Sequence, residues 1–139
     1  MSDKITKDNL IALAEKARLD SYSPYSNISV GAALLSKSGK VYLGVNIENA
    51  SYTPTVCAER VAFFKAISEG EREFSAIAIV GGAVGAKPTK PFTPCGVCRQ
   101  VMAEFCDENF KVFVFDGKET REYSLSELFP YGFSSEALN

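Results

Sequence analysis

The chain contains no histidine among its 139 residues. This absence excludes the Ser-His-Asp and Cys-His arrangements of nucleophilic enzymes, because each of them needs an imidazole as general base. It also limits metal chemistry. A closed structural zinc site would need a fourth cysteine within reach of three others, since no histidine can complete the coordination.

Long apolar runs and clusters of like charge are missing as well. No stretch approaches the ~20 apolar residues that cross a membrane. The first ten residues, MSDKITKDNL, lack the apolar core of a signal peptide. We therefore expect a cytoplasmic protein with no membrane partner. The net charge is −2 and no basic patch stands out. Nucleic acid is not expected as a partner, because phosphate contacts need clustered lysine and arginine.

The length and composition indicate a single domain over residues 1–139. Hydrophobic residues make up 46% of the chain and charged residues 23%, which is ordinary for a globular protein with one core. No repeat and no shift in composition divides the sequence. The four cysteines are expected to be thiols, metal ligands or core residues, because disulfides rarely persist in the cytosol.

Hydrophobic periodicity and turn residues predict alternating helices and strands. The predicted helices cover residues 6–20, 57–69 and 95–107, and a short last helix opens with a capping box at residues 124–127. The predicted strands cover residues 28–36, 41–48, 74–82, 110–116 and 120–124. This order predicts an α/β fold, a three-layer α-β-α sandwich whose mixed five-stranded sheet carries helices on both faces. We expect the first two strands to be antiparallel and the strands after the helices to be parallel.

Three cysteines occupy the starts of two predicted helices. Cys57 precedes one helix, and Cys95 and Cys98 form a Cys-x-x-Cys at the start of the other. Unpaired N–H groups and the helix dipole favour a thiolate there, and thiolates are the form that binds zinc. Three protein ligands leave the fourth tetrahedral position of zinc open, as in catalytic sites.

The neighbouring Glu59 and Cys106 receive different interpretations. Glu59 stands two residues after Cys57, so its carboxylate can reach the open side of the metal and transfer protons there. Its alternative role is only to favour the helix dipole. Cys106 lies eight residues after Cys98, about 12 Å along a continuous helix. We expect it to be a core residue.

Two interpretations without hydrolytic chemistry stay open at this point. Cys95 and Cys98 alone could form a thioredoxin-like redox pair, although no strand stands directly before them and a partner cysteine lies upstream. A zinc-binding module without activity would use all three sulfurs. Such a module has no need for an open position with a carboxylate beside it.

Together these residues resemble the signature of the zinc-dependent nucleoside and nucleobase deaminases, Cys-Ala-Glu followed by Pro-Cys-x-x-Cys. More narrowly, the chain is similar to the small homotetrameric cytidine deaminases that use three cysteines. The resemblance covers nearly the whole chain, through residues 23–35, 44–52, 56–60, 94–105 and 127–138.

The resemblance implies zinc-dependent hydrolysis of free cytidine and deoxycytidine to uridine and deoxyuridine, with release of ammonia, in pyrimidine salvage. One Zn²⁺ per chain would be held by Cys57, Cys95 and Cys98, and Glu59 would move the protons. Arg60 would donate hydrogen bonds to the sulfurs, with Arg99 as a second candidate. The partner would be a small nucleoside, in a homotetramer whose pockets are shared between subunits.

The same resemblance implies a set of substrate contacts. Asn46 and Glu48 would bind the ribose 3′-hydroxyl, and the Ala58 backbone N–H would lie by the pyrimidine carbonyl. Tyr52 would border the sugar, and Phe133 would help to close the pocket of a neighbouring subunit. The full set of expected substrate-binding residues is Ile28, Asn46, Glu48, Ala50, Tyr52, Ala58 and Phe133.

Ile28 departs from the family pattern, which commonly has a phenylalanine that stacks on the pyrimidine. Isoleucine offers apolar cover without the geometric preference of an aromatic ring, a difference of about 1 kcal/mol. An alternative substrate is therefore a modified or antibiotic cytosine nucleoside of the blasticidin S type. Deamination of cytosines in RNA or DNA is disfavoured, since no basic surface interleaved with aromatics is evident.

Overall fold

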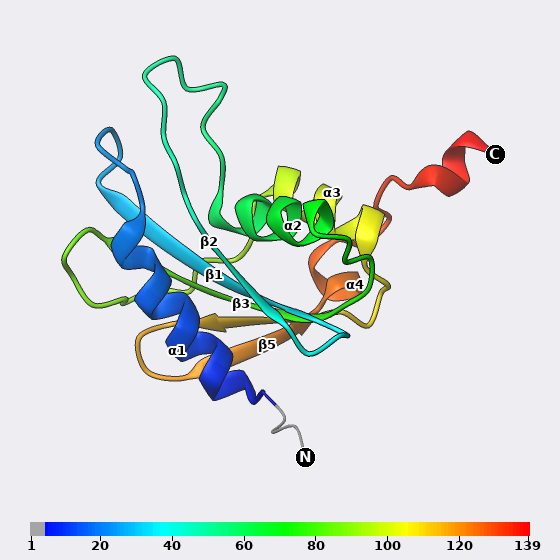
Figure 1. The fold of residues 1–139 in the computed structure, drawn as a ribbon, viewed down its shortest axis with the longest axis horizontal. Helices are drawn as coiled ribbons and strands as arrows, with labels where there is room; N and C mark the ends of the chain where they lie inside the picture. The colour runs from blue at the N-terminus through cyan, green and yellow to red at the C-terminus, as the bar shows by residue number, and fades with distance from the viewer. Residues whose placement is uncertain (1–4) are drawn as a thin grey trace.

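The computed structural model describes residues 5–139, which fold around a five-stranded sheet of order β2-β1-β3-β4-β5 (Figure 1). The strands are β1 (Ile28–Ser36), β2 (Val41–Val45), β3 (Phe74–Ala83), β4 (Lys111–Phe115) and β5 (Thr120–Ser124). The helices are α1 (Lys7–Ala17), α2 (Ala58–Ser68), α3 (Gly96–Phe105) and α4 (Leu125–Leu128), with 3-10 turns at Arg18–Asp20 and Ser135–Leu138.

Helices cover both faces of the sheet, so the predicted three-layer sandwich is confirmed (Figure 1). Side chains of a strand point alternately to the two faces. Ala33 of β1 accordingly belongs to the core under α1, where Leu10 and Ala14 are buried. Ala32 and Leu34 point the other way and belong to the core under α2 and α3. Each face of the sheet therefore carries its own hydrophobic cluster.

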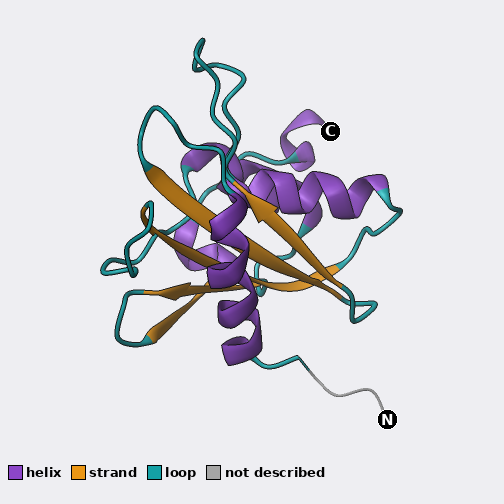
Figure 2. Cartoon of the chain, turned by 60° about the vertical axis from the view of Figure 1, so that its left-hand side comes forward, coloured by secondary structure: helices purple, strands orange, loops and turns teal. Residues whose placement is uncertain are grey.

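The strand directions make the sheet mixed. β1 pairs antiparallel with β2, as predicted, and also antiparallel with β3. β3 and β4, which follow α2 and α3, run parallel to each other, and β5 returns antiparallel to β4. β2 is shorter than the predicted strand 41–48 and ends at Val45. Beyond it, Ile47 forms isolated bridges with Tyr22 and Val56. The loop from β2 to α2 extends away from the sheet in both views (Figure 2).

Two glycines let helices contact the backbone of the sheet. A Cβ added to Gly44 of β2 would lie 2.2 Å from the carbonyl oxygen of Ala58 and 2.6 Å from the amide nitrogen of Ala62. A Cβ on Gly31 of β1 would lie 2.0 Å from the carbonyl oxygen of Ala14, on the opposite face. Gly44 thus fixes the first turn of α2 directly against β2, and this turn carries the candidate site.

The helix ends carry the predicted signals. Ser124 and Glu127 form the capping box of α4. Gly70, at φ 100°, follows α2, and its N–H donates to Ile67 while that of Glu71 donates to Ala66, a Schellman ending. Within residues 5–139, none of the helices has the length and apolar character that a membrane crossing requires.

A candidate metal centre at two helix N-termini

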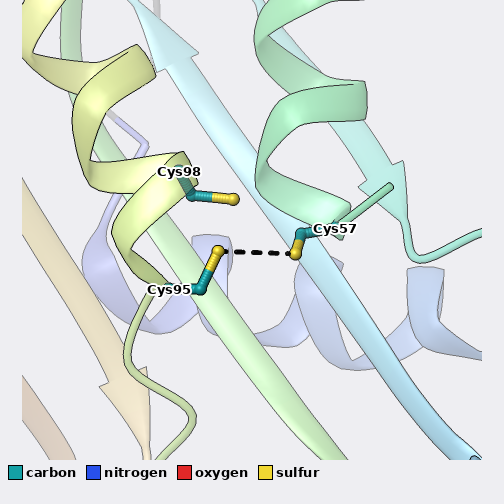
Figure 3. Close-up of side chains that lie close together, drawn as sticks. All are labelled: Cys57, Cys95 and Cys98. Carbon is teal, nitrogen blue, oxygen red and sulfur yellow. Dashed lines mark hydrogen bonds between the residues drawn. The ribbon is translucent and has the colours of Figure 1, made fainter. Parts of the chain in front are cut away.

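The three candidate ligands lie where α2 and α3 begin, side by side on one face of the sheet (Figure 3). Cys57 is the N-cap of α2 and Cys95 the N-cap of α3, both with extended backbone. Cys98 is the third residue of α3. The two helix starts predicted from the sequence are therefore confirmed. Both helix dipoles present their positive ends to the sulfurs, which favours thiolates.

The spacing of the sulfurs fits a metal ion. The three Sγ atoms lie within 4.8 Å of one another, and those of Cys57 and Cys95 are 3.7 Å apart. Two sulfurs each ~2.3 Å from a tetrahedral zinc are separated by about 3.8 Å. Cys106 lies at the C-terminal end of the continuous α3 and takes no part in this cluster. It is partly buried and packs against the core under α2 and α3, as expected of a core residue.

The surroundings of Cys57 favour its thiolate. Hydrogen bonding from Cys98, with help from Arg60, lowers the pKa of Cys57. The same hydrogen bond, together with burial, raises the pKa of Cys98. Nη2 of Arg60 lies 3.7 Å from the Cys57 sulfur, in position for the contact expected of it. A thiolate is thus already favoured on Cys57 beside a cation.

Arg99, the second candidate for contacting the sulfurs, has another place in the structure. Its Nε donates to the carbonyl oxygen of Pro94 at 2.7 Å, and its Nη1 donates to that of Leu128. The guanidinium therefore ties the loop before Cys95 to the end of α4. Sequence adjacency to Cys98 could not reveal this, because the contact with Leu128 joins residues that lie far apart in the chain.

Glu59 is a buried carboxyl beside the sulfurs. Its side chain is 4% exposed, on the second residue of α2. Burial is the main cause that raises the pKa of Glu59 to about 7, and the charge of Cys57 acts in the same direction. A carboxyl with a pKa near neutrality can both accept and donate a proton at physiological pH, which is what general acid–base catalysis requires. Glu59 therefore has the burial and the pKa of a proton-transfer group.

A cavity of about 310 Å³ reaches the sulfurs and Glu59, a size at the lower end for small-molecule sites. Expected site residues that line it are Ile28, Asn46, Glu48, Cys57, Ala58, Glu59 and Cys95. The remaining lining residues were not expected from the sequence and are Ser26, Val30, Thr55, Val56, Ile79, Phe92 and Thr93. Two of these lining residues, Thr55 and Thr93, could have been found from the sequence, because each stands two residues before a cysteine of the cluster.

Asn46 and Glu48 are held in place by backbone groups of the neighbouring segments. Asn46 accepts a hydrogen bond from the Val30 amide at 2.9 Å and donates to the Ile28 carbonyl at 2.8 Å. Glu48 accepts from the amides of Tyr25 and Ser26 at 2.9 and 3.1 Å, and from the Ser26 hydroxyl. Hydrogen bonding from Ser26 keeps the pKa of Glu48 below its usual value. Both side chains are fixed before any ligand arrives, and Glu48 is charged.

Three of the expected substrate residues lie outside this cavity. Ala50 and Tyr52 belong to the extended loop between β2 and α2, and Tyr52 is 72% exposed at φ 62°. Its ring meets that of Tyr25 edge-to-face at a neighbouring hollow that shares Glu48 with the cavity. Phe133, 58% exposed, lines a separate hollow beside α3 and α4. Within one chain, Phe133 does not contribute to the candidate site.

Comparison with known proteins matches this arrangement to one family. Residues 4–114 match the model of the cytidine and deoxycytidylate deaminase zinc-binding region. The chain belongs to the cytidine and deoxycytidylate deaminase family. A cytidine deaminase of Halalkalibacterium halodurans is 50% identical over 131 residues, 94% of this chain and 96% of that protein. A 1.6 Å crystal structure of cytidine deaminase from Burkholderia pseudomallei covers 92% of this chain and 99% of its own, with TM-score 0.84 and 44% identity.

A deaminase named for a different substrate is also similar to this chain. The blasticidin-S deaminase of Bacillus cereus is 31% identical over 104 residues, 73% of this chain and 74% of that protein. The identity and coverage are both lower than for the Halalkalibacterium halodurans cytidine deaminase. The expected family membership is thus confirmed, and the cytidine deaminases of Halalkalibacterium halodurans and Burkholderia pseudomallei are more similar to this chain than the antibiotic deaminase is.

Proposed function

We propose that the protein catalyses the hydrolytic deamination of free cytidine and deoxycytidine to uridine and deoxyuridine, releasing ammonia in pyrimidine salvage. The observation that supports this most strongly is the cavity in which the sulfur cluster and the buried carboxyl of Glu59 meet. The likeness to named cytidine deaminases over most of the chain supports the substrate class. We infer that residues 1–139 act as one domain.

One Zn²⁺ per chain would be held by Cys57, Cys95 and Cys98. When bound, the ion supplies Lewis acidity that lowers the pKa of a water molecule toward neutrality. Three thiolates leave the centre with a formal charge of −1, which weakens that acidity. The Arg60 guanidinium, next to the Cys57 sulfur, offsets part of this charge.

Glu59 would carry the protons of the reaction. Its carboxylate takes a proton from the attacking water and gives it to N3 of the cytosine, which makes C4 more electrophilic. After the water oxygen has added to C4, Glu59 takes the remaining proton from that oxygen and passes it to the amino group, which leaves as ammonia while the oxygen becomes the carbonyl of uridine. The pKa near 7 supports this role, because one group must accept and donate protons in the same cycle.

The nucleoside would be positioned by groups that face the cavity. Ala58 is the first residue of α2, so its backbone N–H has no partner within the helix and can donate to the pyrimidine carbonyl. Asn46 and Glu48 would bind the ribose 3′-hydroxyl through the acceptor and donor capacity that their backbone contacts leave free. Ala50 and Tyr52 would border the sugar from the extended loop.

We further propose a cytoplasmic homotetramer with pockets shared between subunits. Phe133 is exposed and does not line the cavity of its own chain, which supports a role at the pocket of a neighbouring subunit. Three free thiols at a metal centre favour a reducing compartment. Size-exclusion chromatography with light scattering tests the assembly, and a stable, fully active monomer would contradict it.

The second candidate function is deamination of a modified cytosine nucleoside of the blasticidin S type. Ile28 at the cavity wall favours it, because the aromatic ring that commonly stacks on the pyrimidine in cytidine deaminases is missing at this position. The two functions are distinguished by measuring kcat/KM of the zinc-loaded protein for cytidine, deoxycytidine and blasticidin S. We expect the two nucleosides to be turned over more efficiently. A higher kcat/KM for blasticidin S would replace the first proposal with the second.

A further inference from the structure

Phe92 is the one aromatic side chain among the described residues that line the cavity. It comes from the loop between β3 and α3, three residues before Cys95. The apolar wall contributed by the strands is aliphatic, with Ile28 and Val30 from β1 and Ile79 from β3. An aromatic surface for a bound base is therefore available from the loop that carries a metal ligand, and not from the sheet.

Gly81 supports the ring of Phe92 on the backbone of β3. A Cβ at position 81 would lie 2.6 Å from Cγ and Cδ2 of Phe92 and 3.1 Å from Cδ1. No residue with a side chain can keep this contact, because real Cβ atoms essentially never approach other atoms so closely. Gly81 is the register partner of Val30 across β1 and β3. The ring is thus fixed beside the strand pair that forms the cavity wall.

The loop that carries Phe92 is also fixed relative to the sulfur cluster. Pro94 is buried, and its carbonyl oxygen accepts the 2.7 Å hydrogen bond from Arg99 on α3. Cys95 follows directly as the N-cap of the same helix. Phe92 is partly buried and packs against the core under α2 and α3. The distance between the ring and the metal ligands is therefore set by the fold.

We propose that Phe92 is the aromatic contact of the pyrimidine ring in this protein and takes the place of the ring that position 28 lacks. The proposal rests on the proposed function, since it assumes a cytosine base in this cavity. A base whose C4 lies by the sulfur cluster needs an apolar face fixed relative to that cluster. Aromatic faces prefer offset-stacked or edge-to-face contacts with another ring, which Ile28 cannot provide.

The test uses steady-state kinetics of the zinc-loaded protein with cytidine. Phe92→Leu keeps an apolar side chain and removes the ring, so we expect KM to rise about three- to tenfold with kcat within about twofold. Adding Ile28→Phe to this variant places a ring on the β1 wall of the cavity. We expect it to reverse at least half of the increase in log KM. The matched control is Phe64→Leu, which removes an exposed ring of α2 that does not line the cavity, and it should leave KM unchanged.

Equilibrium binding separates failure of this inference from failure of the proposed function. Cytidine is titrated by calorimetry into the zinc-loaded Glu59→Gln protein, with and without Phe92→Leu. A three- to tenfold weaker Kd in the double variant supports the inference even if the wild-type protein does not turn cytidine over. An equal Kd in both proteins, or a KM that Phe92→Leu leaves unchanged, overturns it. A lowered melting temperature without a change in KM or Kd would show that Phe92 only packs the core, and would also overturn it.

Discussion

Gly44 provides a direct way to move the site without touching any of its side chains. In Gly44→Ala the new Cβ would lie 2.2 Å from the Ala58 carbonyl oxygen, whereas ordinary contacts begin at 3.4 Å. The first turn of α2 must therefore shift by about 1.2 Å, carrying Cys57 and Glu59 with it. A misplacement of about 1 Å can cost about 100-fold in rate. We expect kcat/KM for cytidine to fall by about that factor, and stability to fall by about 1–3 kcal/mol from overpacking.

Gly31→Ala is the matched control for this experiment. Its Cβ would lie 2.0 Å from the Ala14 carbonyl oxygen, an equally severe clash, but on the face covered by α1. We expect a similar loss of stability in urea unfolding and a kcat/KM within about threefold of wild type. Both variants are assayed well below their melting temperatures with zinc content measured. Equal losses of kcat/KM in the two variants would refute the view that Gly44 positions the site.

Three further predictions follow from the same contacts. Removal of zinc with a chelator should abolish turnover, and added Zn²⁺ should restore it at about one ion per chain; turnover by metal-free protein would contradict the cysteine site. Arg99→Met should lower the free energy of unfolding by about 2–4 kcal/mol, because the Pro94 and Leu128 carbonyls lose charged donors, and an unchanged urea midpoint would count against this. The pKa of Glu48 is lowered in the folded state, so its charge stabilises the protein above the unfolded value of 4.5 and this contribution disappears as the pH falls. The melting temperature of Glu48→Gln should therefore lie below that of wild type at pH 7 and approach it as the pH falls below the usual carboxyl range. A difference in melting temperature that stays constant with pH would contradict a stabilising charge on Glu48.

The cluster of three cysteines could be predicted from the sequence because its signal is local. The residues around Cys57 and Cys95 indicate helix starts, and in the structure both cysteines are N-cap residues. The sequence also places Glu59 in the first turn of α2, and the structure shows that its carboxyl is buried there. The three layers could be predicted in a similar way. Strands alternate with helices along the chain, and a short continuous apolar run such as β3 indicates a strand that is covered on both faces.

Contacts between segments distant in the chain could not be predicted in the same way. The meeting of Phe92 with Gly81 depends on the path of the loop between β3 and α3, which carries no periodic signal. Sequence adjacency favours a contact of Arg99 with the sulfurs, but the direction of its side chain depends on α4, folded from a segment about thirty residues away. The predicted strand 41–48 is too long, because Asn46 turns its amide onto β1 and ends the ladder.

Proton transfer by Glu59 is the step on which the proposed reaction depends most directly. The measurement is the loss of cytidine absorbance with purified wild-type protein and with Glu59→Gln, at equal and verified zinc content. The glutamine side chain keeps the shape of the original and cannot exchange the protons, so we expect turnover by the wild type and a loss of at least about 100-fold in the variant. Equal turnover by the two proteins at equal zinc content would contradict the mechanism.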